Sequence, residues 1–222
     1  MGETKDLGIT YTFVVPSYRG YWTSSGPHPR QSTIEKDMKG VYRYILRRGW
    51  EKTPKSDDEE VQYIFWGQSI GSNIIVTTLS QNFDMINSKE AVNDNRIPAL
   101  LILETPFISI SDMLLEMYPQ KWLPYRYLSP FLWNLWDMRK ALKAIDGRTV
   151  GNVLVLRAEN DELVSSMQGE KVLQVLKEAF GNDGKRVQDV LVRGALHVQC
   201  MEKGKGREAV VSSIRDVVIG GE

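Results

Sequence analysis

The sequence predicts an α/β protein with a mainly parallel sheet covered by helices on both faces. Strand-like runs of β-branched and aliphatic residues alternate with amphipathic helical runs along the chain. This alternation is typical of parallel strands joined by helical crossovers. A strand-like run, a glycine-flanked serine and an apolar helical run also follow one another at residues 61–79. This order predicts a tight turn that exposes the serine at one edge of the sheet.

Composition and charge narrow the class of protein. The 222 residues are 42% hydrophobic and 25% charged, which is an ordinary globular composition, and no repeat or break in composition divides them. We therefore expect one domain over residues 1–222. Lysine plus arginine equals aspartate plus glutamate at 28 each, so no basic surplus indicates a nucleic-acid partner. One cysteine, Cys200, and two histidines show no metal-ligand spacing, and we expect neither a metal nor another cofactor.

The sequence shows no membrane-spanning or secretory segment. No apolar run approaches the roughly eighteen residues needed to cross a bilayer. The first six residues carry no apolar signal-peptide segment. The compartment is not fixed by these observations, and an intracellular location is the expectation that agrees best with them.

One strand and one helix are predicted before the serine motif. Residues 10–15 form a β-branched and aromatic run that is typical of a buried strand. Capping-box spacing at residues 32–35 predicts the start of a helix, and Gly49 is expected to end it. The charged, proline-containing residues 51–60 are expected to form a solvated connection.

The remaining elements continue the alternation. The polar residues 82–96 are expected to form a surface excursion between two of them. The same hydrophobic patterns predict strands at residues 61–66, 99–103, 153–156 and 187–192, and helices at residues 73–79 and 168–180.

The serine motif predicts a catalytic nucleophile. A serine hydroxyl is a poor nucleophile in water, so acyl-transfer enzymes expose it on a strained turn beside a base and backbone donors. The segment Gly67-Gln68-Ser69-Ile70-Gly71 fits, because its glycines leave room for a sharp turn. We assign Ser69 as the nucleophile and the Ile70 N–H, at the start of a helix, as an oxyanion donor. The alternative is a purely structural turn, since the bare pattern also occurs by chance.

The search for a general base is short, because the chain contains only two histidines. His28 lies in a proline-rich loop upstream of Ser69 and is expected to be an exposed loop residue. His197 follows the last predicted strand, where a loop at the carboxyl end of the strand would bring it over the serine. His197 is therefore the candidate base, and a structural histidine is the alternative.

The acid that orients the histidine is expected at the end of another strand. The loop after the strand at residues 153–156 offers Glu159, Asp161 and Glu162. Their positions in the sequence leave all three open as the acid. At least two of them must be ordinary surface charges.

Residues 106–152, between the predicted strands at residues 99–103 and 153–156, are rich in tryptophan and tyrosine. Such clusters are more often core packing than ligand sites. An insertion between the strands that carry nucleophile and acid commonly covers the mouth of a pocket, which favours a lid. We expect residues 118–142 to be largely helical, with Trp133 and Trp136 forming an apolar wall for the substrate.

Taken in order, these motifs resemble the bud-emergence-type (Bem-like) α/β-hydrolases of fungi and the animal serine hydrolases that are their kin. The resemblance covers the chain from about Ile9 to its end. It implies the α/β-hydrolase fold with a small helical lid. In the family's acid loop the aspartate stands three residues before a valine, which here implies Asp161 as the acid. The resemblance rests on Ser17-Tyr18-Arg19-Gly20-Tyr21, Gly67-Gln68-Ser69-Ile70-Gly71, Ile102-Leu103-Glu104-Thr105-Pro106-Phe107 with Ser109, Ala158-Glu159-Asn160-Asp161-Glu162-Leu163-Val164 and Gly194-Ala195-Leu196-His197.

The resemblance also implies an activity. It suggests a serine hydrolase that cleaves a carboxylic ester or thioester with an apolar acyl group through an acyl-enzyme. The substrate classes it implies are carboxylic esters, acylglycerols, lysophospholipids and S-acylated proteins. Relatives often carry a membrane anchor before this domain, so the resemblance allows a membrane-attached full-length parent.

Three departures from the family pattern stand out. Ser165-Ser166 replaces the prolines that usually follow the valine of the acid loop. Ser72 replaces the glycine that usually follows the motif, and is expected to tighten the turn. Relatives also carry, upstream of residue 10, a strand whose His-Gly loop supplies a second oxyanion donor. The resemblance therefore implies an N-terminally truncated domain with weak activity. The rival hypothesis is a catalytically inactive or truncated α/β-hydrolase-fold protein that acts as an interaction module.

Overall fold

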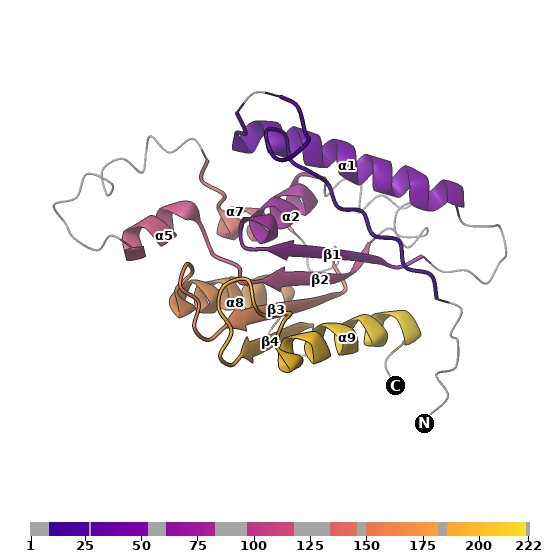
Figure 1. Ribbon diagram of the computed structural model, residues 1–222. Coiled ribbons are helices and arrows are strands. Elements are labelled where there is room, and N and C mark those ends of the chain that lie inside the picture. Colours follow the sequence, from indigo (N-terminus) through magenta and orange to yellow (C-terminus); the bar gives the residue numbers. More distant parts are fainter. Residues whose placement is uncertain are drawn as a thin grey trace.

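The computed structural model describes residues 9–26, 28–52, 61–82, 97–117, 134–145, 150–181 and 186–220. Helices and strands alternate along the described chain, as the sequence predicts (Figure 1). The elements are α1 Gln31–Lys52, β1 Tyr63–Gln68, α2 Ile70–Gln81, β2 Pro98–Glu104, α5 Ile110–Met117, α7 Met138–Lys143, β3 Asn152–Ala158, α8 Ser166–Phe180, β4 Val187–Val192 and α9 Gly204–Ile219.

The four described strands form one parallel sheet in the order β1-β2-β3-β4. Trp66 of β1 pairs with Ile102 of β2, and Ile102 pairs in turn with Leu154 of β3. Because all four strands run in the same direction, their carboxyl ends lie at one edge of the sheet. The residues that follow β1, β3 and β4 are the ones in which the sequence places its candidate nucleophile, acid and base.

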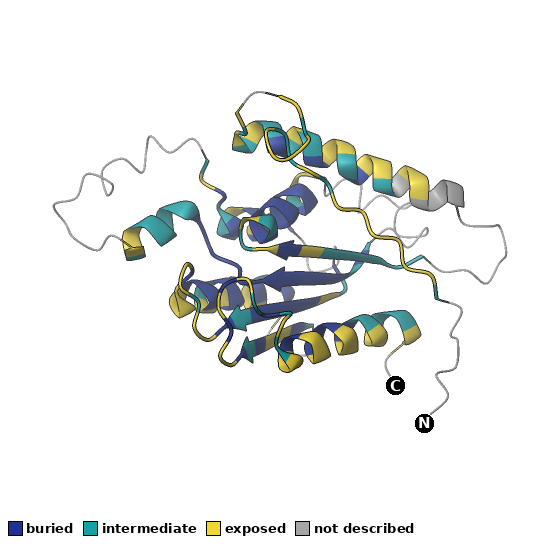
Figure 2. Cartoon of the chain, in the orientation of Figure 1, coloured by how far each residue is buried: buried dark blue, intermediate teal, exposed yellow. Residues whose placement is uncertain are grey.

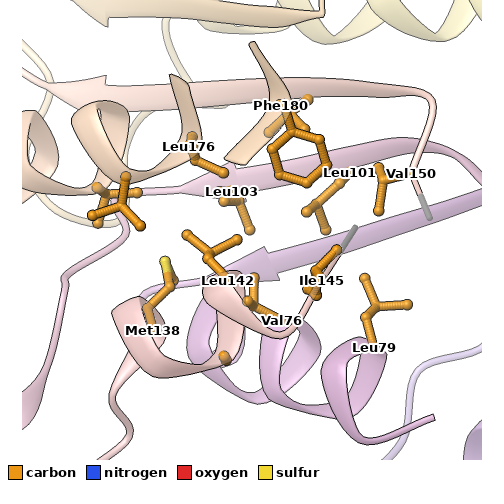
Figure 3. Close-up of a cluster of buried hydrophobic side chains, with 14 of the residues drawn as sticks. Val76, Leu79, Leu101, Leu103, Met138, Leu142, Ile145, Val150, Leu176 and Phe180 are labelled. Atoms are coloured by element: carbon orange, nitrogen blue, oxygen red, sulfur yellow. The ribbon is translucent and has the colours of Figure 1, made fainter. Parts of the chain in front are cut away.

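Helices cover both faces of the sheet, which explains why the central strands are apolar at nearly every position. On one face, Leu101 and Leu103 of β2 pack in a buried cluster with residues of α2, α7 and α8 (Figure 3). On the other face, Leu100 and Ile102 pack in a second cluster that includes residues of α9. Figure 2 shows the central strands coloured mostly as buried.

Helix α1 forms an outer layer beyond α2. Its residues Ile34 and Met38 belong to a buried cluster with Ile74 of α2 and Trp136. The helix begins one residue before the predicted cap, and the Thr33 hydroxyl accepts the N–H of Arg30 at 3.1 Å. The prediction that Gly49 ends this helix is wrong, since α1 continues to Lys52. An interior glycine costs a helix only about 1 kcal/mol relative to alanine, which a long helix tolerates.

The predicted strand at residues 10–15 is not formed. These residues are exposed and pair with none of the described strands (Figure 2). Phe13 and Val15 keep 84% and 88% of their surface in contact with solvent. High β-propensity does not make a strand without a neighbouring strand to accept and donate its backbone hydrogen bonds.

Helices α5 and α9 were not predicted, whereas α7 falls largely within residues 118–142, which were expected to be helical. Helix α9 closes one face of the sheet, and α7 lies against α2 and α8 in the cluster on the other face. None of the described helices is long and apolar enough to span a membrane. Residues 118–133, which include Trp133 and make up most of the segment predicted to be helical, lie outside the described residues. Within the described part, residues 134–137 are not helical and α7 begins at Met138.

Candidate active site

Ser69 occupies a strained turn between β1 and α2. Its backbone has φ 51° and ψ −120°, a conformation that non-glycine residues rarely adopt. The Ser69 N–H donates to the carbonyl of Glu104 on the neighbouring strand at 2.8 Å. The Ser72 hydroxyl donates to the Gly67 carbonyl at 2.7 Å and so ties the start of α2 to the end of β1. The strain at Ser69 is thus held in place by hydrogen bonds on both sides of the turn.

The two glycines of the motif play different parts. A Cβ atom at Gly67 would lie 2.5 Å from the backbone carbonyl of Gly71 and 2.6 Å from the Ser72 nitrogen. A Cβ atom at Gly71 would meet nothing within 4 Å. The close approach of backbone to backbone therefore requires glycine at position 67 alone.

This asymmetry predicts opposite results for two otherwise identical substitutions. Gly67→Ala forces the turn open and displaces Ser69, and a misplacement of about 1 Å can cost roughly 10²-fold in turnover. Gly71→Ala lies in α2, where alanine is favoured over glycine, and is expected to leave both turnover and melting temperature close to those of the parent chain. Ester turnover and thermal unfolding of the two variants measure this. Equal losses would contradict the geometry described for Gly67.

Asp161 and His197 lie together at the carboxyl edge of the sheet. The loop after β3 carries Asp161 and the loop after β4 carries His197, and both side chains are almost fully buried. His197 Nδ1 lies 2.9 Å from Asp161 Oδ2 and 3.0 Å from Asp161 Oδ1. With Asp161 ionised, the proton is assigned to Nδ1, and this leaves Nε2 as the acceptor.

Glu159 and Glu162, the two other candidate acids, accept hydrogen bonds from backbone N–H groups. Glu159 accepts the backbone N–H of Gly194 at 2.9 Å, and Glu162 accepts the backbone N–H of His197 at 3.0 Å. Both glutamates therefore hold the backbone of the histidine loop rather than the imidazole. The acid loop and the histidine loop are thus joined by three carboxylates, of which only Asp161 contacts the ring.

The environment of Asp161 favours its charged form. Burial raises the pKa of this carboxyl, but hydrogen bonds from His197 and from the N–H groups of Val164 and Leu163 outweigh it, and the net pKa is lowered. Since the folded-state pKa lies below the unfolded one, the resulting stability is present at neutral pH. It is lost as the pH falls through the folded-state pKa.

Ser69 and His197 are not hydrogen-bonded. The sequence predicts that Ser69 Oγ and a ring nitrogen of His197 lie close to hydrogen-bonding distance, and the described residues contain no such bond. Catalytic hydrogen bonds are often long without substrate and tighten only in the complex. His28, the other histidine, is exposed in the loop before α1, as expected.

Ile70 is the first residue of α2, so its N–H belongs to the helix end that lacks intrahelical acceptors. The dipole of α2 adds partial positive charge at this end. A negative charge that develops beside Ser69 would therefore meet a favourable field and at least one backbone donor.

The structure describes one of the two predicted substrate-binding tryptophans. Trp133 lies outside the described residues. Trp136 is only 2% exposed and packs with Ile34, Met38 and Ile74 between α1 and α2. Its assignment as a wall of the substrate pocket is therefore wrong, because the ring is enclosed by helix packing.

Other apolar side chains, which the sequence analysis missed, are exposed on elements that adjoin the site. They belong to the starts of α2 and α8, to α5, and to the loops after β3 and β4. No single periodic pattern marks them, because they are spread over separate segments. They are Ile70, Leu115, Met117, Leu163, Met167, Leu196 and Val198.

The described residues contain no group of three or more histidine, cysteine, aspartate or glutamate side chains placed to hold a metal ion. Cys200 is buried, and burial together with the charges of Glu104 and Asp161 raises the pKa of its thiol to about 12. The thiol is therefore neutral near pH 7. The chemistry available at this edge is that of a serine, an imidazole and carboxylates.

Known proteins resemble the chain in sequence and in fold. No known family model matches the chain. The chain is 28% identical to the zebrafish (Danio rerio) lysophosphatidylserine lipase ABHD12 over 189 residues, which cover 81% of this chain and 43% of that protein. It is 27% identical to protein bem46 of Schizosaccharomyces pombe over 152 residues, 68% of this chain and 42% of that protein. The chain thus spans less than half the length of these curated relatives.

Solved structures share the fold at low sequence identity. A Pyrococcus furiosus esterase superposes with a TM-score of 0.56 at 14% identity, covering 90% of this chain and 67% of that one. An α/β-hydrolase from Vibrio vulnificus superposes with a TM-score of 0.54 at 15% identity, covering 87% and 58%. The parallel sheet, the strained serine turn and these superpositions define an α/β-hydrolase fold. By sequence the chain is similar to the ABHD12-type and Bem46-type proteins.

Proposed function

We propose that the protein is a serine hydrolase with Ser69 as nucleophile, His197 as general base and Asp161 as the acid that orients the imidazole. The observation that carries this proposal is the buried Asp161–His197 pair at the same sheet edge as the strained Ser69 turn. A buried aspartate bound to Nδ1 fixes the tautomer in which Nε2 accepts the serine proton. Few structural roles require this combination.

The proposed reaction proceeds in two halves. Ser69 Oγ attacks the acyl carbonyl while His197 Nε2 takes its proton, and the Ile70 N–H stabilises the oxyanion. The imidazolium then returns the proton to the leaving alcohol or thiol, and an acyl-enzyme remains on Ser69. Water, activated by the same imidazole, releases the acid and restores the serine.

The proposed substrate is a carboxylic ester or thioester with an apolar acyl group. The exposed apolar side chains on the loops around the triad support this, since Leu163, Leu196 and Val198 would lose contact with water when they cover an acyl chain. The zebrafish relative is named a lysophosphatidylserine lipase, which is consistent with a lipid substrate. S-acylated proteins belong to the same chemical class.

A second candidate function is an inactive α/β-hydrolase-fold interaction module. One observation favours it: the described residues contain no Ser69–His197 hydrogen bond. Among the described residues we assign a single oxyanion donor, the Ile70 N–H. In other hydrolases the loss of one such donor lowers kcat by roughly 10²–10³-fold.

Covalent labelling by a fluorophosphonate probe separates the two functions, because the probe reports an activated serine without a known substrate. We expect the parent chain to be labelled and Ser69→Ala to remain unlabelled. The two histidines provide a matched control: His197→Gln should lose labelling, whereas His28→Gln should keep it. A folded parent chain that is not labelled would support the interaction module instead.

A further inference from the structure

Helix α5 is held against α8 by charged side chains. It follows β2 and lies at the end of the sheet towards which the strands point (Figure 1). None of its residues is buried. Glu116 Oε1 accepts a hydrogen bond from Lys171 Nζ of α8 at 2.7 Å, and Asp112 Oδ1 lies 3.6 Å from the same nitrogen. In the described part of the chain, carboxylates rather than a buried apolar face therefore attach α5 to α8.

The Glu116 carboxylate also contacts the end of the acid loop. Its Oε2 accepts the hydroxyl of Ser165, which is the N-cap residue of α8. A serine at an N-cap commonly accepts an N–H from the first turn of its own helix, and this bond stabilises the helix. The Ser165 side chain makes no such bond. The hydroxyl is thus used to join the acid loop to another helix, which a capping role does not explain.

Ser165 adjoins the backbone groups that hold the proposed catalytic acid. The preceding residue, Val164, is 4% exposed, and its N–H donates to Asp161 Oδ1 at 2.7 Å. The Leu163 N–H donates to the same oxygen at 3.0 Å. Asp161 Oδ2 in turn lies 2.9 Å from His197 Nδ1. Each step from Ser165 to the imidazole is therefore a hydrogen bond or a short stretch of backbone.

We propose that Glu116 is a positioning residue for the acid Asp161. It fixes the end of the acid loop through Ser165, and so keeps the Leu163 and Val164 N–H groups on the carboxylate. This inference rests on the proposed function, because it concerns the acid of that triad. Glu116 takes part in no covalent step. Its contribution is to hold the carboxylate in the place from which it orients the imidazole, since small displacements of a catalytic group are costly.

The environment of Glu116 suits an anchor that accepts two hydrogen bonds. Burial raises the pKa of its carboxyl, but hydrogen bonds from Lys171 and Ser165 outweigh burial, and the net pKa is lowered. Glu116 is therefore ionised near neutral pH. Asp112 belongs to the same charged cluster and lies 3.6 Å from both Lys171 and Arg139, but none of its described contacts reaches the acid loop. Asp112 is thus a matched control.

Hydrogen exchange of the Leu163 and Val164 amides tests the proposal without requiring activity. Glu116→Ala and Ser165→Ala should each speed the exchange of both amides about tenfold, the effect expected for one hydrogen bond to a charged group. The two effects should not add in the double variant, because both substitutions remove the same contact. Asp112→Asn should leave these amides unchanged. If Glu116 only docked α5, its loss would speed exchange within α5 and leave the acid loop protected.

Kinetics provide the second measurement. If the chain is a hydrolase, Ser165→Ala should lower kcat about tenfold with KM little changed, because the acid acts on the imidazole and not on substrate binding. Ser165→Thr keeps a hydroxyl at this position and should restore both kcat and amide protection. Asp112→Asn should keep kcat within about twofold of the parent value, as expected for an exposed ion pair.

A folded Ser165→Ala protein whose Leu163 and Val164 amides exchange as slowly as in the parent chain would overturn the proposal. If Glu116→Ala does not fold, Ser165→Ala decides, since Ser165 is exposed and its hydroxyl does not cap α8. Failure of the proposed function gives a different result. Faster exchange in the acid loop, with no fluorophosphonate labelling of the parent chain, would support the anchoring and contradict only the hydrolase activity.

Discussion

Asp161→Asn is expected to lower kcat by about 10³- to 10⁴-fold while the chain stays folded. The corresponding change in another serine hydrolase costs about 10⁴. The physical reason is the tautomer. An asparagine amide can donate to His197 Nδ1, where the carboxylate only accepts. The ring proton then moves to Nε2, and the nitrogen that should accept the serine proton no longer has a free lone pair.

The neighbouring glutamates are matched controls for this prediction. Glu159→Gln and Glu162→Gln keep an amide oxygen that can still accept the N–H groups of Gly194 and His197. We expect each to change kcat by no more than a few fold, since neither carboxylate contacts the imidazole. Ester turnover at saturating substrate measures all three variants. A loss in Glu162→Gln as large as that in Asp161→Asn would show that the acid has been misassigned.

Much of the sheet could be predicted from the sequence because its signals are local. The strands after residue 60 are short apolar runs, and those at residues 61–66 and 153–156 are each followed by a loop and a helical pattern. The parallel order then places Ser69 and the loops of Asp161 and His197 at one edge without further information. His197 could be chosen as the candidate base because the chain has only two histidines.

The elements that could not be predicted depend on contacts between distant parts of the chain. Residues 10–15 have the composition of a strand, but a strand also needs a partner, and composition does not reveal whether one is adjacent. The choice among Glu159, Asp161 and Glu162 depends on which side chain reaches the ring, and a shift of one or two residues in a loop changes that. The resemblance to a family, rather than the spacing, chose Asp161.

Two buried residues show the same limit at the level of single side chains. Glu104 ends an apolar strand and its carboxyl is buried there, which its place in the sequence does not indicate. The aromatic segment around Trp136, between the strands that precede the candidate nucleophile and the candidate acid, predicts a lid. Whether an aromatic ring covers a pocket or fills a gap between helices depends on the packing of α1 and α2, which the local sequence does not encode.

Trp136→Ala is expected to destabilise the protein by about 3–5 kcal/mol, the range for removing a large buried aromatic side chain. The ring fills the space between Ile34 and Met38 of α1 and Ile74 of α2, so its removal leaves a cavity that rigid helices close only in part. Trp136 has a positive φ of 40°, and alanine at this position keeps the same backbone strain. The expected loss is therefore one of packing rather than of backbone conformation.

Trp22 provides the control, because it shares the residue type and the positive φ, at 50°, but is 95% exposed. Trp22→Ala should change the free energy of unfolding by no more than about 0.5 kcal/mol, as expected for surface substitutions. Denaturant unfolding of the two variants gives both values directly. If Trp136 instead formed a wall of the substrate pocket, its replacement would leave stability nearly unchanged and would lower turnover of long-chain esters more than that of acetate esters. The packing described here predicts the reverse: a large loss of stability, with turnover of the remaining folded protein reduced alike for short and long acyl chains.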